Sequence, residues 1–126
     1  MSNVPAGLKY SKEHEWVKME GKTAIVGITD HAQSQLGDIV FIELPKVGAN
    51  VTFMKPFGVA ESTKAASDIF SPLTGKVTAV NDQLMKNPEA INKDPYGGGW
   101  MVKIEPSKPD ELNNLLDDKA YANLIK

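Results

Sequence analysis

Cysteine and arginine are both absent from the 126-residue chain. The absence of cysteine excludes disulfides, thiolate nucleophiles and thiolate metal ligands, so any sulfur redox chemistry has to come from an attached group. All 14 basic residues are lysine, and the planar, bidentate guanidinium that favours phosphate and nucleic-acid recognition is therefore missing. A net charge of −2 and the lack of a glycine-rich phosphate loop point the same way. We expect no nucleic-acid partner.

Long apolar runs are absent as well. No stretch approaches the length of a membrane-spanning helix, and Met1 to Ser11 has neither the apolar run of a secretion signal nor the Arg-rich pattern of a transit peptide. These features favour the cytoplasm and no association with a membrane. The composition, 41% hydrophobic and 24% charged residues, is typical of a globular protein. Because no linker interrupts it, we expect a single domain over residues 1–126.

Short strands dominate the pattern of the chain. Segments rich in β-branched residues are bounded by Gly, Pro, Asn and Asp, which is typical of a small β domain. The expected strands are Thr23–Ile28, Ile39–Leu44, Gly58–Ser62, Lys76–Val80 and Trp100–Ile104.

Two main helices are expected, and Asn87 and Pro88 can open one further short turn of helix. Thr29 and Asp30 can cap a short helix His31–Leu36, and Gly37 follows where a left-handed residue often ends a helix. A second helix, starting at Pro109, is expected to close the chain, because acidic residues fill its first turn and five apolar residues fall on roughly one stripe. The five are Leu112, Leu115, Leu116, Leu124 and Ile125.

Lys64 lies at a polar tip between two apolar segments. The tip lacks glycine, which disfavours a primed two-residue turn and favours a looser type I hairpin turn led by Ser62 and Thr63. Such a turn exposes Lys64, and the small side chains of Ala65 and Ala66 leave room for an enzyme that acylates the ε-amine. From spacing alone, however, Lys64 is more simply interpreted as a lysine that keeps the surface soluble.

The motifs around this lysine are more specific. The run Glu61-Ser62-Thr63-Lys64-Ala65, followed by Asp68-Ile69-Phe70-Ser71-Pro72 and Gly75-Lys76-Val77, resembles the lipoyl attachment hairpin of the glycine cleavage system H-protein family. Further segments resemble the same family: Leu8-Lys9-Tyr10-Ser11, His14-Glu15-Trp16-Val17, Val26 to Gln33, Leu36-Gly37-Asp38, Glu43-Leu44-Pro45, Pro95-Tyr96, Gly99-Trp100 and Pro109-Asp110-Glu111-Leu112. Together they span nearly the full length, and Val51 to Phe57 is a stretch that departs from the family.

The resemblance implies a fold and a role. The implied fold is mainly β, a lipoyl-domain-like barrel-sandwich hybrid of two small antiparallel sheets with short flanking helices and a C-terminal helix. The implied role is that of a non-catalytic carrier with lipoate attached covalently to Lys64. In that family the arm takes an aminomethyl group from glycine decarboxylase (P-protein) and gives it to aminomethyltransferase (T-protein). Dihydrolipoamide dehydrogenase (L-protein) reoxidises the arm, and a lipoate ligase or a lipoyl/octanoyl transferase attaches it.

Three acidic residues gain roles from the same resemblance. Glu15 matches the glutamate that lines the family's cleft for the loaded arm, where a carboxylate favours the protonated amine and the cleft excludes water. Without the resemblance, Glu15 would be taken for an ordinary surface glutamate. Glu61 and Asp68 flank the lysine and are expected to serve recognition by the ligase and the partner enzymes.

His14 and His31 are expected to be structural or surface residues. No nucleophile stands at a suggestive spacing from either, and two isolated histidines do not make a metal site. We therefore expect neither a catalytic residue nor a metal.

Other functions remain open at this point. The main alternative is an H-protein-like scaffold for lipoate storage or relay. A lipoyl domain of a 2-oxo acid dehydrogenase fits less well, because such domains usually lie in longer chains without the His-Glu-Trp segment and the C-terminal helix. A biotin carrier would place methionine on both sides of the lysine, where Thr63 and Ala65 stand. A stand-alone hydrolase would need a nucleophile, a base and an orienting group, and the chain offers no such set.

Overall fold

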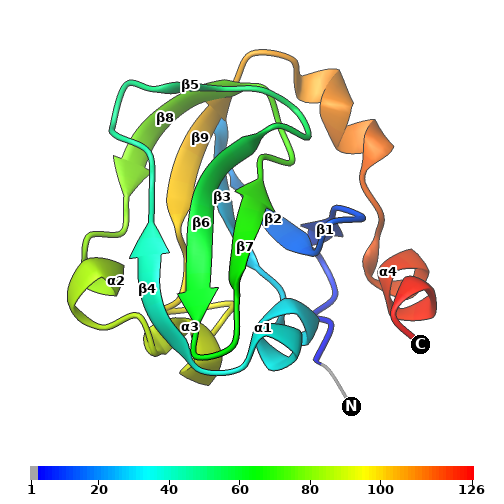
Figure 1. The fold of residues 1–126 in the computed structure, drawn as a ribbon. Coiled ribbons are helices and arrows are strands. Elements are labelled where there is room, and N and C mark those ends of the chain that lie inside the picture. The colour runs from blue at the N-terminus through cyan, green and yellow to red at the C-terminus, as the bar shows by residue number, and fades with distance from the viewer. Residues whose placement is uncertain (1–2) are drawn as a thin grey trace.

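Two antiparallel sheets face each other in the computed structural model, which describes residues 3–126 (Figure 1). The larger sheet has the strand order β1-β2-β3-β9-β8-β5, and the smaller has the order β4-β6-β7. The strands are β1 Lys9–Tyr10, β2 Glu15–Glu20, β3 Thr23–Ile28, β4 Ile39–Glu43, β5 Asn50–Val51, β6 Pro56–Ser62, β7 Ala66–Phe70, β8 Gly75–Val80 and β9 Val102–Pro106. The mainly β prediction is confirmed.

Both ends of each predicted strand lie within two residues of the observed ends. The last predicted strand differs most, because it is shifted by two residues at both ends. The expected strand Trp100–Ile104 is found as β9, Val102–Pro106. Trp100 lies before the strand because its carbonyl accepts a hydrogen bond from the Asn81 side-chain amide at 2.7 Å, and its ring packs with the aromatic cluster of Tyr10, Trp16 and Tyr121. The Trp100 carbonyl thus bonds to a side chain instead of to the backbone of a neighbouring strand.

Short helices connect and flank the strands. They are α1 Asp30–Leu36, α2 Gln83–Lys86, α3 Ala90–Lys93, the 3₁₀ helix η1 Pro109–Asn114 and α4 Asp118–Leu124. The predicted ends of α1 are confirmed: the Thr29 side chain accepts a hydrogen bond from the Ala32 N–H, and Gly37 has φ 84°. No helix within residues 3–126 has the length and apolar character needed to cross a bilayer.

The expectation of one continuous closing helix is wrong. The chain forms η1, then an extended break, then α4. In the break, Tyr10 and Leu116 exchange two backbone hydrogen bonds of 2.8 and 2.7 Å, so Leu116 pairs with the edge of the large sheet instead of continuing a helix. Asp117 then caps α4 by accepting from the Ala120 N–H. Leu124 is 49% exposed and does not belong to a buried stripe.

Apolar side chains fill the space between the sheets. Alternation along β6 turns Gly58 and Ala60 inward, and Ala60 pairs in register with Ile42 of β4. Val26 and Ile104 of the larger sheet belong to the same cluster of buried residues as Ile42 and Ala60.

A second, aromatic cluster fixes the end of the chain. Tyr121 of α4 stacks on Tyr10 with ring centroids 4.7 Å apart, and Trp16 lies in the same cluster. A side chain at Gly27 would collide with the Trp16 indole, at 2.8 Å, so glycine is required opposite this ring. The cluster therefore ties α4 to the start of β2, where the site begins.

Candidate functional site

Lys64 lies in the turn between β6 and β7. Figure 1 shows that this hairpin ends at one end of the molecule, near α1. Ser62 organises the tip: its N–H donates to the Ala65 carbonyl at 2.8 Å, and its hydroxyl accepts from the Lys64 and Ala65 N–H groups, both at 3.1 Å. The Thr63 N–H also donates to the Asp38 carbonyl, which joins the tip to the segment after α1. Lys64 is exposed, as predicted.

The Lys64 side chain lies across Gly37 rather than pointing freely into solvent. Its ammonium nitrogen donates to the Gln35 carbonyl at 3.4 Å. A Cβ atom at Gly37 would stand 3.1 Å from Lys64 Cε. The absence of a side chain at Gly37 therefore leaves room for the lysine stem, and the stem is directed toward the C-terminal end of α1.

The Lys64 nitrogen contacts the carbonyl of Gln35, and Gln35 is one of the residues that line a cleft. We call it the hairpin cleft; it has a volume of about 320 Å³ and is formed by the start of β2, the end of β3, α1 and the β6–β7 hairpin. Its lining residues are Glu13, His14, Glu15, Ile28, His31, Ala32, Gln35, Leu36, Ala60, Ser67, Asp68 and Ile69. The fold thus places Glu15 and Asp68 in the lining of one cleft, whereas Glu61 lies on the exposed side of β6, paired with Phe41 and Ala66.

Glu15 is buried in the wall of this cleft, with 1% of its surface exposed. One carboxyl oxygen accepts from the Ser11 hydroxyl at 2.5 Å, and the other accepts from the Phe70 N–H at 3.3 Å. Burial outweighs these hydrogen bonds and raises the pKa of Glu15 to about 8. With the cleft empty at neutral pH, the carboxyl group is therefore mostly protonated. An ordinary surface glutamate is excluded.

His14 and His31 face each other in the same cleft, with ring centroids 4.9 Å apart. His14 has φ 76°, and its Nδ1 is 2.8 Å from the Tyr121 hydroxyl. Burial, and then the nearby His31, lower the pKa of His14. No group of three or more metal-ligating side chains occurs in residues 3–126.

The meeting of the two histidines was missed from the sequence, although a signal for it exists. Glu15 and Ile28 are paired at the open end of the β2–β3 hairpin. His14 directly precedes Glu15, whereas His31 lies three residues after Ile28, in the first turn of α1. The Thr29 N–H donates to the His14 carbonyl at 3.0 Å, so the pairing continues one residue beyond the strands and brings this turn close to His14. A prediction that paired β2 with β3 would have brought them near each other.

Comparisons with known proteins agree with this geometry. The family model described as Glycine cleavage H-protein matches residues 8–126. The glycine cleavage system H protein of Symbiobacterium thermophilum is 59% identical over 126 residues, which cover 100% of this chain and 98% of the relative. That of Myxococcus xanthus is 56% identical over 124 residues, which cover 98% of this chain and 96% of the relative. A crystal structure of a glycine cleavage system H protein from Mycobacterium marinum is similar, with TM-score 0.88, 36% identity and coverage of 95% and 97%.

The chain belongs to the glycine cleavage H-protein family. It is thus a carrier subunit of the glycine cleavage system, in the lipoyl carrier role of that family. The predicted lipoyl-domain-like barrel-sandwich fold is confirmed by the likeness to the solved H protein.

The residues of this H-protein fit a lipoyl group. Lys64 offers an exposed amine, and the space above Gly37 would be filled by any Cβ atom. A lysine stem extended by an eight-carbon acid has a reach on the order of 12 Å, and the cleft starts at Gln35, which the lysine nitrogen already contacts.

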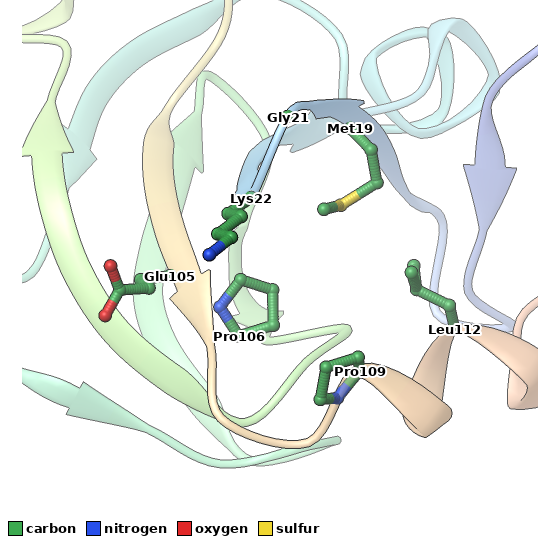
Figure 2. A pocket seen from close by; sticks show the side chains of 7 residues that line it. All are labelled: Met19, Gly21, Lys22, Glu105, Pro106, Pro109 and Leu112. Atoms are coloured by element: carbon green, nitrogen blue, oxygen red, sulfur yellow. The ribbon is translucent and has the colours of Figure 1, made fainter.

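A larger cavity, of about 510 Å³, lies away from these residues (Figure 2). It is formed by the end of β2, the β2–β3 turn, the end of β9 and η1. Its apolar walls are Met19, Pro106, Pro109 and Leu112, and its charged groups are Lys22 and Glu105. It contains none of the predicted site residues, so size alone does not identify the functional cleft of this H-protein.

Proposed function

We propose that lipoate is attached to Lys64 through an amide and that the loaded end of the arm is held in the hairpin cleft. The observation that carries this proposal is the direction of the Lys64 side chain, whose nitrogen contacts the carbonyl of Gln35, a residue that lines the cleft. Attachment removes the positive charge of Lys64 but leaves one N–H, so this contact can persist. When bound, the lipoyl group supplies the thiol and disulfide chemistry that a chain without cysteine lacks.

Glu15 is proposed as the residue that protects the cargo. The aminomethyl cargo carries an amine, and the lone pair of the free amine can break the carbon–sulfur bond and expel the thiolate. The iminium ion that leaves is hydrolysed by water to formaldehyde and ammonia. An ammonium entering the cleft favours the carboxylate form of Glu15, because an opposite charge nearby lowers the pKa of a carboxyl group. The pair then keeps the amine protonated, and the surrounding apolar wall, which includes Ile28 and Ile69, excludes water.

Glu61 and Asp68 are proposed to serve recognition by the enzymes that act on the hairpin. Both are exposed and flank Lys64 on β6 and β7. Asp68 also lines the hairpin cleft, whereas Glu61 does not. A lipoate ligase or a lipoyl/octanoyl transferase would approach this face to reach the amine.

The remaining proposals concern the setting of the carrier. Its partners would be glycine decarboxylase, aminomethyltransferase and dihydrolipoamide dehydrogenase, and the site of action would be the cytoplasm. The chain itself would be non-catalytic, so that no glycine is cleaved when the lipoylated protein is incubated without added enzymes. Residues 1–126 would act as one domain, which is supported by the single apolar cluster shared by both sheets.

The lifetime of the loaded protein tests the role of Glu15. Glu15→Gln keeps the shape of the side chain but removes the charge, and one pKa unit of lost ammonium stabilisation raises the free-amine fraction near neutral pH by up to about tenfold. Formaldehyde and ammonia release, measured without aminomethyltransferase, should accelerate by a similar factor. Glu89→Gln, at an exposed position outside the cleft, is the matched control. Equal lifetimes for wild type and Glu15→Gln would remove Glu15 from the proposal.

A further inference from the structure

A chain of buried hydrogen bonds leads from helix α1 to the wall of the hairpin cleft. The Ala32 N–H donates to the Thr29 hydroxyl oxygen at 3.1 Å. The Thr29 hydroxyl lies 2.7 Å from the Tyr121 hydroxyl, which lies 2.8 Å from His14 Nδ1. Thr29 and Tyr121 are both 0% exposed, so water does not complete their hydrogen bonds.

The direction of this chain follows from the number of acceptors. Within residues 3–126 the Thr29 hydroxyl proton has one acceptor in reach, the Tyr121 oxygen. If Tyr121 donated to Thr29 instead, the Thr29 proton would be buried without a partner, which costs about 1–3 kcal/mol. Thr29 therefore donates to Tyr121, and Tyr121 donates to His14 Nδ1.

This direction fixes the state of His14. Because Nδ1 accepts a hydrogen bond, the neutral imidazole carries its proton on Nε2. Nε2 makes no hydrogen bond to the described residues and is the nitrogen left to the cleft, which His14 lines. The titratable groups around the ring are Glu13, Glu15, His31 and Tyr121. Burial and the neighbouring His31 also disfavour the imidazolium, since both lower the pKa of His14.

We propose that Tyr121 is a positioning residue for the carrier function: it holds His14 neutral, with Nε2–H presented to the hairpin cleft. The cleft then offers a hydrogen-bond donor to the acceptor atoms of the arm and no competing positive charge to its cationic cargo. A charged His14 would repel an ammonium group bound beside Glu15. The inference rests on the proposed docking of the loaded arm in this cleft.

The placement of Tyr121 explains why the C-terminal helix belongs to the site. Tyr121 stacks on Tyr10 with nearly parallel rings, 8° apart, which fixes the position of its hydroxyl. That hydroxyl contacts both Thr29, the N-cap residue of α1, and His14 of the cleft wall. It adds a side-chain link to the backbone hydrogen bond of 3.0 Å that the Thr29 N–H donates to the His14 carbonyl. The last element of the chain thus orders the cleft without lining it.

Nitrogen NMR of the histidine rings in the unmodified protein tests the assignment without any arm or partner. In the wild type, His14 should show one neutral tautomer with the proton on Nε2. In Tyr121→Phe, the tautomers should become mixed and the pKa of His14 should shift upward. Tyr10→Phe is the matched control, because it removes a hydroxyl from the same cluster that, among residues 3–126, bonds to the Pro5 carbonyl alone. A wild-type His14 protonated on Nδ1 would overturn the inference even if Tyr121→Phe failed to fold.

The lifetime of the loaded protein separates this inference from the proposed function. Tyr121→Phe should shorten the lifetime several-fold at pH 7, whereas Tyr10→Phe should leave it unchanged once both variants are shown to be folded. If Glu15→Gln shortens the lifetime and Tyr121→Phe does not, the role of Tyr121 is refuted while the docking proposal survives. If neither substitution has an effect, both are refuted.

Discussion

The lysine tip and the wall of the hairpin cleft are built in opposite ways. The tip is exposed and is shaped by hydrogen bonds among neighbours in the sequence, mainly those of Ser62 with Lys64 and Ala65. The wall is buried and depends on distant residues, such as His14 and Tyr121, which are 107 positions apart. The proposed attachment site is therefore encoded locally and is separable from stability. The proposed protection of the cargo depends on the whole fold, so substitutions in the wall should change stability and function together.

Removing the lysine gives the largest expected effect on function and almost none on the fold. Lys64→Arg should abolish carrier activity in a reconstituted glycine cleavage assay, because the tip of the hairpin then carries no amine that can be acylated. Its free energy of unfolding should change by no more than about 0.5 kcal/mol, as is usual for an exposed site. Lys55→Arg, also exposed, is the control that should retain full activity. A large loss of stability in Lys64→Arg would contradict the separation drawn above.

Glu15 should make stability depend on pH. Its pKa is raised from an ordinary 4.5 to about 8, so the native state keeps a proton that the unfolded chain has released. The stabilisation is complete below pH 4.5 and is lost as the pH rises to 8, with a slope of at most about 1.4 kcal/mol per pH unit. Urea unfolding at pH 5 and pH 8 should show this loss in the wild type and a clearly smaller one in Glu15→Gln. Identical pH profiles would mean that Glu15 is ionised in the native protein.

Gly37 lies where the two regions meet. Gly37→Ala places a methyl group beside the lysine stem and strains a backbone with φ 84°, at a cost of about 1–3 kcal/mol. Gly48→Ala is a matched control, since Gly48 has φ 94° and open space around it. Both variants should lose similar stability, but only Gly37→Ala should lose the nuclear Overhauser effects between residue 37 and the Lys64 ε-methylene and shorten the lifetime of the loaded protein. Equal lifetimes in the two variants would show that the stem takes another path.

The two acidic neighbours of the lysine should differ in a smaller but informative way. Glu61→Gln and Asp68→Asn should each slow lipoylation of Lys64 by several-fold, as measured by intact mass over time with a purified ligase. Only Asp68→Asn should also shorten the lifetime of the loaded protein, because Asp68 lines the cleft and Glu61 does not. If both variants behave alike in the two assays, Asp68 does not differ from Glu61 in its effect on the cargo, and its assignment to the cleft wall as well as to the tip is contradicted.

The same division explains what the sequence could reveal. Strand β3 and the Thr29 and Gly37 ends of α1 follow from local patterns and were predicted. The break between η1 and α4 was not, since it depends on the pairing of Leu116 with Tyr10 across the whole chain.

The candidate site divides in the same manner. The exposure of Lys64 follows from a local turn, and the family resemblance pointed to Glu15 as a cleft residue. The burial of Glu15 and its raised pKa require Ser11 and Phe70 to be placed around it. The contact of His14 with Tyr121 has no local signature at all, because it joins the start of β2 to the last helix.

Peptide mapping of the chain, purified from cells that contain lipoylation enzymes, tests the central claim most directly. We predict that lipoate is found on Lys64 and on none of the other 13 of the 14 lysines. We also predict that Lys64→Arg yields no lipoylated peptide under the same conditions. Lipoate on a different lysine, or continued modification of Lys64→Arg, would contradict the account.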